Sequence, residues 1–279
     1  MNRHDWIEYG IKELSKEEIE NAQGEAWYLF SHCFHITRED YLFSMTEEVV
    51  EGKELQLYKE YIKERITKRM PLQYILGTQD FMGYTFRVTP DVLIPRADTE
   101  SVLETVIESG IKPKSILDVC TGSGCIAVSL GLILRPERCM AVDIDADALK
   151  IAKENGRNLL PMVEFIQSDL FESVFETFDL IISNPPYIPT KDCEELMPEV
   201  REHEPLIALD GMEDGLHFYR RIVKEAPGYL NDNGMLAFEI GYNQGKDVKC
   251  MMEEAGFIDV ILNQDLAGLD RVVMGRKKG

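Results

Sequence analysis

The chain has 279 residues, 44% of them hydrophobic and 29% charged, and a formal net charge of −20. This composition is that of a soluble globular protein of one or two domains, and its negative charge counts against binding that neutralises many phosphates. No apolar stretch approaches the roughly 18 residues of a membrane span, and the first ten residues lack a signal-peptide core. The six cysteines are scattered without a Cys-x-x-Cys pair. We therefore expect a cytoplasmic protein with reduced thiols rather than disulfides or a zinc site.

Residues 1–75 are predicted to form a small all-helical domain. Ser15-Lys16-Glu17-Glu18 has the pattern of a capping box that begins a helix, and Thr37 is expected to begin a second, short one. A further helical pattern runs from Leu55 to Met70 and stops before Pro71. Such a domain is either a structural appendage or a module that docks a partner, and we favour docking.

Residues 76–97 are predicted to be a β-hairpin linker. Gly83 lies where a tight turn would join two short strands. Asp98 is expected to cap the next helix, which begins a catalytic domain over 98–279. Arg96, at the end of this linker, is either a site residue or a surface arginine that caps a turn.

From Ser115 onward strands and helices alternate, which indicates a parallel, doubly wound sheet. The first strand, 115–119, leads into a glycine-rich loop that lacks the third glycine of a dinucleotide loop. Asp118, just before this loop, would repel a pyrophosphate but suits a ligand with an amino group. Gly122 and Gly124 would let the backbone approach that ligand closely.

Two further acids follow the next strands. Asp143 ends the strand after the glycine loop, where an acid accepts hydrogen bonds from ribose hydroxyls. Asp169 follows the third strand and could meet an adenine amino group. Each acid could also be a helix cap or a solvated turn residue, but together they describe a ligand with an amine, a ribose and an adenine. S-adenosylmethionine fits this description.

The stretch 178–188 joins a buried strand to a rigid turn. Its apolar first half is typical of a parallel strand, and Pro185 and Pro186 cannot continue in a sheet. Open α/β sheets bind their ligands at such strand ends, and Asn184 and Tyr187 would provide an amide and an aromatic wall there. The same residues are also compatible with a plain exit from a strand.

The remaining elements complete the sheet. We expect a helix over 216–229, a strand over 234–240, a helix over 245–255 and a final antiparallel hairpin of 260–262 with 271–274. His203 is predicted to be a hydrogen-bonded residue of the pocket wall and not a metal ligand, because it has no partner at metal-binding spacing. No metal site is predicted.

With the glycine loop and the Asn-Pro-Pro-Tyr elbow (residues 184–187) in place, the chain resembles the HemK/PrmC family of protein-(glutamine-N5) methyltransferases. Further segments resemble the family over nearly the full chain: 94–100, 199–205, 208–211 and 238–241. Ala97 stands where a second proline is usual. Cys120 replaces a common glycine of the cofactor loop, and Leu170 stands where an aromatic residue often flanks adenine. Phe171 is a possible substitute for that aromatic.

The resemblance implies a class I, Rossmann-like methyltransferase with a seven-stranded sheet, which transfers a methyl group from S-adenosyl-L-methionine. The acceptor would be the side-chain nitrogen of the glutamine in the Gly-Gly-Gln motif of peptide chain release factors. The implied catalytic residues are Asn184, Pro185 and Tyr187. Substrate binding would involve these residues with Pro186, Arg96, His203, Glu204 and Pro205. Cofactor binding would involve Asp118, Cys120, Thr121, Gly122, Ser123, Gly124, Asp143, Asp169, Leu170 and Asn184.

Other functions are weighed against this one. An amino-methyltransferase acting on N6 of adenine or N4 of cytosine in nucleic acid uses a similar elbow, but it needs a basic, base-flipping surface. The intact elbow disfavours a non-enzymatic binding module, and the incomplete dinucleotide loop disfavours an oxidoreductase. We expect a monomer that binds release factors and neither binds nucleic acid stably nor enters a membrane.

Overall fold

The computed structural model describes residues 1–265 and 267–279, and the chain divides into two compact units. The first unit contains Met1–Gly77 and also a short later segment, Pro198–His203. The second contains Thr78–Met197 and Glu204–Gly279. Each unit is described by itself below.

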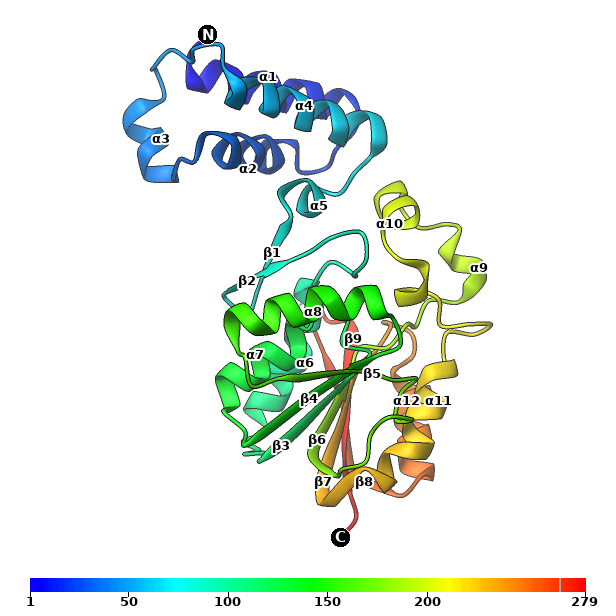
Figure 1. Ribbon diagram of the computed structural model, residues 1–279. Coiled ribbons are helices and arrows are strands. Elements are labelled where there is room, and N and C mark those ends of the chain that lie inside the picture. The colour runs from blue at the N-terminus through cyan, green and yellow to red at the C-terminus, as the bar shows by residue number, and fades with distance from the viewer. Residues whose placement is uncertain (266) are drawn as a thin grey trace. The chain divides into compact units, whose positions relative to one another are not determined.

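The first unit is helical (Figure 1). Its helices are α1 (Arg3–Lys16), α2 (Ala22–Phe34), α3 (Arg38–Ser44), α4 (Lys53–Lys68), α5 (Leu72–Leu76) and α10 (Pro198–His203). The side chains of Leu14, Phe30 and Tyr58 are fully buried in its core. Gly10 is needed in α1 because a Cβ there would lie 2.0 Å from the hydroxyl of Tyr58.

A buried charge cluster holds α10 in this unit. The Nε of Arg65 lies 2.7 Å from Glu25 and its Nη1 lies 3.0 Å from Glu199, while Arg69 also pairs with Glu199 at 2.8 Å. The side chain of Arg65 is only 7% exposed, so these carboxylates satisfy a guanidinium that is largely removed from water. Burial raises the pKa of Glu199, but a backbone hydrogen bond and its two arginine partners together outweigh burial, and the pKa stays lowered.

The predicted capping box at Ser15 is wrong. Helix α1 runs from Arg3 to Lys16, and its N-cap is Asn2. The Asn2 side chain accepts from the amide of Asp5, and the Asp5 carboxylate accepts from the amide of Asn2. Glu18 has a φ of +56°, so the chain leaves the helix where the pattern predicted a beginning. The short helix after Thr37 is confirmed, with a complete capping box of Thr37 and Asp40.

The second unit begins with the predicted hairpin. Strands β1 (Thr78–Phe81) and β2 (Tyr84–Arg87) pair antiparallel. Met82 and Gly83 form the turn, with φ values of +50° and +79°, as expected for a two-residue hairpin loop of primed type. The predicted turn at Gly83 is confirmed.

Within the described residues, seven strands form one mixed sheet in the order β5-β4-β3-β6-β7-β9-β8. The first five strands in this order, β5, β4, β3, β6 and β7, pair in parallel with their neighbours. Strand β9 pairs antiparallel with both β7 and β8. The strands are β3 (Ser115–Val119), β4 (Arg138–Asp143), β5 (Glu164–Gln167), β6 (Phe178–Ser183), β7 (Leu230–Glu239), β8 (Phe257–Gln264) and β9 (Asp270–Lys277). The predicted fold class is confirmed.

Helices cover both faces of this sheet (Figure 1). Alternate residues of each strand enter different cores: Ile116 joins the core under α6, α7 and α8, and Leu117 joins the core under α11 and α12. This alternation follows from the two-residue period of a strand. The helices are α6 (Ala97–Glu108), α7 (Cys125–Leu134), α8 (Ala146–Leu159), α9 (Thr190–Cys193), α11 (His217–Glu225) and α12 (Gly245–Glu254), with 3-10 turns η1 (Leu206–Ala208) and η2 (Ala226–Gly228).

Helix α6 corrects one detail of the sequence analysis. Asp98 was expected to be its N-cap, but the helix begins at Ala97 and Arg96 occupies the cap position without a side-chain bond to the backbone. Asp98 lies in the first turn, where a carboxylate is favourable beside the helix dipole. The N-cap therefore lies two residues before the predicted position.

Candidate functional site

The loop between β3 and α7 has an unusual backbone. Cys120, Gly122 and Gly124 have φ values of +62°, +53° and +81°. Glycine adopts this left-handed region freely, whereas Cys120 carries a Cβ and is strained there. The loop thus keeps the conformation that a glycine at 120 would favour, although the side chain is a cysteine.

Asp118 fixes this loop from within the protein. Its Oδ2 accepts from the Thr121 hydroxyl at 2.6 Å and from the amide of Ala127 at 3.1 Å. The residue is fully buried, and burial raises the pKa of its carboxyl to about 7. Asp118 was expected to meet an amino group of the ligand, but the structure leaves it outside the lining of the cavity.

The two later acids do line the cavity. Asp143, at the end of β4, accepts from the amide of Gly122 at 2.8 Å and from the amide of Asp145 at 2.9 Å, one on each carboxylate oxygen. Burial raises the pKa of the Asp143 carboxyl. Asp169 pairs with Arg221 at 3.0 Å, so part of its acceptor capacity is already used by α11.

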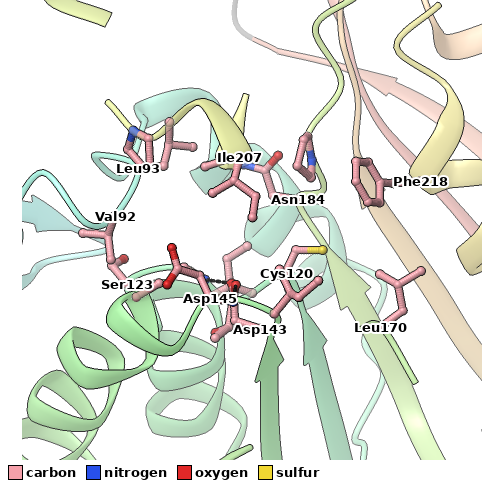
Figure 2. A pocket seen from close by; sticks show the side chains of 18 of the residues that line it. Val92, Leu93, Cys120, Ser123, Asp143, Asp145, Leu170, Asn184, Ile207 and Phe218 are labelled. Carbon is pink, nitrogen blue, oxygen red and sulfur yellow. Dashed lines mark hydrogen bonds between the residues drawn. The ribbon is translucent and has the colours of Figure 1, made fainter. Parts of the chain in front are cut away.

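The cavity measures about 280 Å³, close to the lower end of the size of sites that hold small molecules. Figure 2 shows Cys120, Asp143, Leu170 and Asn184 around it, contributed by the ends of neighbouring strands. The face beside Leu170 also carries Phe218. Phe171 was considered as a substitute aromatic, but it is fully buried and stacks on Tyr229 at 4.6 Å, away from the lining.

The elbow places Asn184 at the cavity (Figure 2). Its Nδ2 donates to the hydroxyl of Thr99 at 3.3 Å, which assigns the amide so that its oxygen remains available as an acceptor. Pro186 also lines the cavity, whereas Pro185 is buried and is not among the lining residues. Tyr187, expected as an aromatic wall, lies outside the lining; its hydroxyl donates to Glu239 at 3.4 Å.

The predicted substrate-binding residues separate into two groups. Arg96 and Pro205 line the cavity, and the guanidinium of Arg96 pairs with Glu204, which is itself buried outside the lining. His203 belongs to the helical unit, where its Nε2 contacts the carbonyl of Lys68. Of the predicted cofactor loop, Cys120, Thr121, Gly122 and Ser123 line the cavity and Gly124 does not.

Several lining residues were missed by sequence reasoning. They are apolar or aromatic residues from loops and from α11: Val92, Leu93, Ile207, Met212 and Phe218, together with Arg221. Phe218 and Arg221 are three residues apart and so share a helix face, which is the one signal that could have indicated them. The loop residues have no periodicity that relates them to the strand ends.

Among residues 1–265 and 267–279, no group of three or more His, Cys, Asp or Glu side chains is placed to hold a metal ion. In the same residues, every helix is too short or too polar to cross a bilayer.

The fold and the strand-end cavity define a class I methyltransferase fold, and known structures agree. A methyltransferase from Pyrococcus furiosus superposes with a TM-score of 0.52 at 16% identity, covering 70% of this chain and 89% of that one. A 16S rRNA methyltransferase of T. thermophilus, in complex with AdoMet and guanosine, gives 0.52 at 17% identity over 72% of this chain and 50% of that one.

Sequence relatives are more specific. Residues 5–77 match the PrmC N-terminal domain, and residues 97–200 match the methyltransferase small domain. The release factor glutamine methyltransferase of Geobacter sulfurreducens is 44% identical over 94% of this chain and 92% of that protein. The one of Clostridium botulinum is 42% identical over 96% of each. This chain belongs to the release factor glutamine methyltransferase family.

Proposed function

We propose that this enzyme transfers a methyl group from S-adenosyl-L-methionine to the side-chain nitrogen N5 of a glutamine in peptide chain release factors. The observation that carries the proposal is Asn184, whose amide nitrogen is held by Thr99 at 3.3 Å while its oxygen is left to accept a bond. Asn184 lies at a cavity that is also lined by acidic side chains. Relatives of this chain are named as release factor glutamine methyltransferases.

The residues around the cavity fit this cofactor. Each oxygen of Asp143 accepts one backbone amide and keeps a lone pair, so the carboxylate can also receive the two ribose hydroxyls. Leu170 and Phe218 offer apolar surface to an adenine. Asp169 can accept from the adenine amino group with the oxygen that Arg221 leaves free. The backbone of the loop 120–124 would lie against the amino acid portion.

The chemistry follows from the acceptors. A glutamine amide is a poor nucleophile because its lone pair is delocalised into the carbonyl. The Asn184 oxygen and the Pro185 carbonyl would accept its two N–H bonds, orient the nitrogen and stabilise the positive charge that develops on it. The bound cofactor supplies an electrophilic sulfonium methyl. No general base is required before transfer, because the proton can leave afterwards.

The alternative acceptor is an amino group of a nucleic acid base. The net charge of −20 opposes the phosphate contacts on which such binding depends, so we favour the protein acceptor and expect no stable nucleic-acid complex. We propose that the helical unit docks the release factor and that the enzyme works as a cytoplasmic monomer. All six cysteines are free thiols, which suits a reducing compartment.

The test of the site is substitution of Asn184. Asn184→Ala should lower turnover by roughly two to three orders of magnitude, the typical loss when a preorganised polar partner is removed, with little change in cofactor affinity. Asn184→Asp keeps an acceptor and should retain more activity than Ala. Asn158→Ala, at an exposed position of α8, is the matched control. Parent-like methylation of a release factor by both Asn184 variants would disprove the assigned role.

A further inference from the structure

The elbow depends on the residues around it for its position, because Pro185 and Pro186 have no N–H with which to bond to the protein. On the near side of the elbow, Ser183 is still paired in the sheet. On the far side, the chain leaves through Tyr187. The backbone that carries Asn184 is therefore positioned by β6 before it and by the contacts that hold Tyr187 after it.

Tyr187 contacts residues 239–244, the bend that follows β7. Its hydroxyl donates to Oε1 of Glu239 at 3.4 Å. Its ring packs on Gly241, where an added Cβ would lie 3.4 Å from the ring Cδ2. Its carbonyl accepts from the Nε2 of Gln244 at 2.9 Å. The bend thus holds Tyr187 at the hydroxyl, at the ring and at the backbone, and the bond from Gln244 acts on the backbone itself.

Gln244 connects three parts of the chain with one buried amide. Its Oε1 accepts from the amide of Gly241 at 3.0 Å, within the bend. Its Nε2 donates to the carbonyl of Tyr187 at 2.9 Å and to the carbonyl of Gly215 at 3.2 Å. A side-chain amide has two N–H groups, so both are used, and the residue is 6% exposed. The amide has one orientation, because turning it over would point its oxygen at the two carbonyls.

The segment 209–215 encloses Tyr187 from another side. A Cβ at Gly215 would lie 2.3 Å from the carbonyl oxygen of Tyr187, and a Cβ at Gly211 would lie 2.8 Å from its Cα. The amide of Ile188 donates to the carbonyl of Leu209 at 3.0 Å. Backbone therefore packs directly on backbone here, and the hydrogen bond from the bend completes the enclosure.

We propose that Gln244 is a positioning residue for methyl transfer, which acts on the elbow through the backbone of Tyr187. The rings of Pro185 and Pro186 restrict the backbone between Tyr187 and Asn184, so a displacement of Tyr187 is passed to Asn184 instead of being absorbed. A displacement of about 1 Å at a reacting site can cost about 100-fold in rate. This inference rests on the function proposed above.

The first experiment compares the parent with Gln244→Met, which keeps the length of the side chain and removes its hydrogen bonds. A purified release factor is the acceptor, and kcat is expressed per cofactor-binding site counted by calorimetry, so that unfolded protein does not contribute. Gln244→Met should lower kcat by roughly 10- to 100-fold and leave KM and the cofactor Kd within about threefold. A residue that only stabilises the fold would lower the number of sites and leave kcat per site unchanged.

Two further variants complete this comparison. Gln264→Met is the matched control and should equal the parent, because Gln264 is exposed on β8 and lies outside the cavity lining. Gln244→Asn keeps a buried amide but draws it back by one methylene, so the bond to Tyr187 is lost or lengthened. This variant should also lower kcat per site, and it takes the place of Gln244→Met if the latter does not fold.

The second experiment needs no acceptor and measures hydrogen exchange by NMR. In the parent, the side-chain NH₂ of Gln244 should exchange at least roughly tenfold more slowly than that of the exposed Gln264, since it is buried and bonded. In the Gln244 variant, the backbone amide of Ile188, just beyond the elbow, should exchange faster than in the parent. The amides of β3 should keep their parent rates.

The two experiments separate the two proposals. Failure of the parent to methylate release factors would refute the proposed function alone, and the exchange rates would still support or refute the anchor at Tyr187. Parent-like kcat per site in the Gln244 variants would overturn the inference. So would unchanged exchange at Ile188, or a Gln244 side chain that exchanges in the parent as fast as that of Gln264.

Discussion

Asp143 shows how one side chain combines a structural and a binding role. Its two oxygens each accept a backbone amide, from Gly122 and Asp145, and these bonds tie the glycine loop to the end of β4. The carboxylate is also at the cavity. A ligand hydroxyl that binds it therefore meets an acceptor already fixed in place, which reduces the cost of ordering on binding.

We expect Asp143→Ala to weaken cofactor binding by about 1.5–3 kcal/mol, the scale of hydrogen bonds to a charged group. Calorimetric titration with S-adenosylmethionine measures this directly. Asp147→Ala is the matched control, because Asp147 is exposed in the first turn of α8 and lies outside the lining. Equal affinities of the parent and the Asp143 variant would remove this residue from the cofactor site.

Residue identities could be predicted where local chemistry was sufficient. Asn184, Asp143 and Asp169 lie at or shortly after the ends of strands whose carboxyl ends must share one edge of a parallel sheet, and all three line the cavity. Tyr187 follows β6, as Asn184 does, but its hydroxyl bonds to Glu239. That bond crosses 52 positions of the sequence, and no spacing rule relates such partners.

At the scale of elements, Gly156 explains how α8 packs. A Cβ at Gly156 would lie 2.4 Å from the Cε2 of Phe165 in β5, so this glycine admits the ring. From the sequence alone, a glycine within a helix can mark either a weak point of the helix or a close approach of another element. The contact with Phe165 of β5 shows that Gly156 marks a close approach.

Gly156→Ala should therefore destabilise the protein, although alanine favours a helix by about 1 kcal/mol. Overpacking against Phe165 typically costs about 1–3 kcal/mol and should outweigh that gain. Gly228→Ala is the control, since a Cβ at Gly228 meets nothing within 4 Å and its φ is not left-handed. Urea denaturation of both variants checks this; a Gly156 variant as stable as the control would contradict the packing argument.

The prediction of a capping box at Ser15 was wrong for a reason that also lies at the scale of the helix. Four residues specify the pattern, but helix length is decided by packing, and α1 buries Leu14 in the helical core before ending at Lys16. The real N-terminal box pairs Asn2 with Asp5.

At the scale of the whole molecule, the least predictable feature is that Pro198–His203 belongs to the helical unit although both flanking segments belong to the other. Arg65 and Glu199 are 134 positions apart, and charged residues carry no periodic signal of burial. The segment lies between the elbow and the lining residues Pro205 and Ile207 in sequence. Deletion of residues 1–70 would therefore also remove the partners of Glu199.

A point substitution is a cleaner probe of this cluster than deletion. Arg65→Met should destabilise the helical unit by roughly 3 kcal/mol, because it leaves Glu25 and Glu199 buried without their shared cation, although Arg69 partly compensates. Lys68→Met removes an exposed pair with Glu64 and should cost less than about 1 kcal/mol. Chemical denaturation followed by circular dichroism measures the free energy of unfolding of both variants. Equal losses would show that the buried cluster stabilises the protein no more than the exposed pair does.

The net charge of −20 and the family relationship converge on a protein acceptor. The most direct measurement is transfer of labelled methyl from S-adenosylmethionine, with a purified release factor and nucleic acid offered in parallel, followed by mass spectrometric location of the label. We predict one methyl group on the side-chain amide of a glutamine of the release factor, lost with Asn184→Ala. Label on adenine or cytosine with none on the release factor would contradict the central claim.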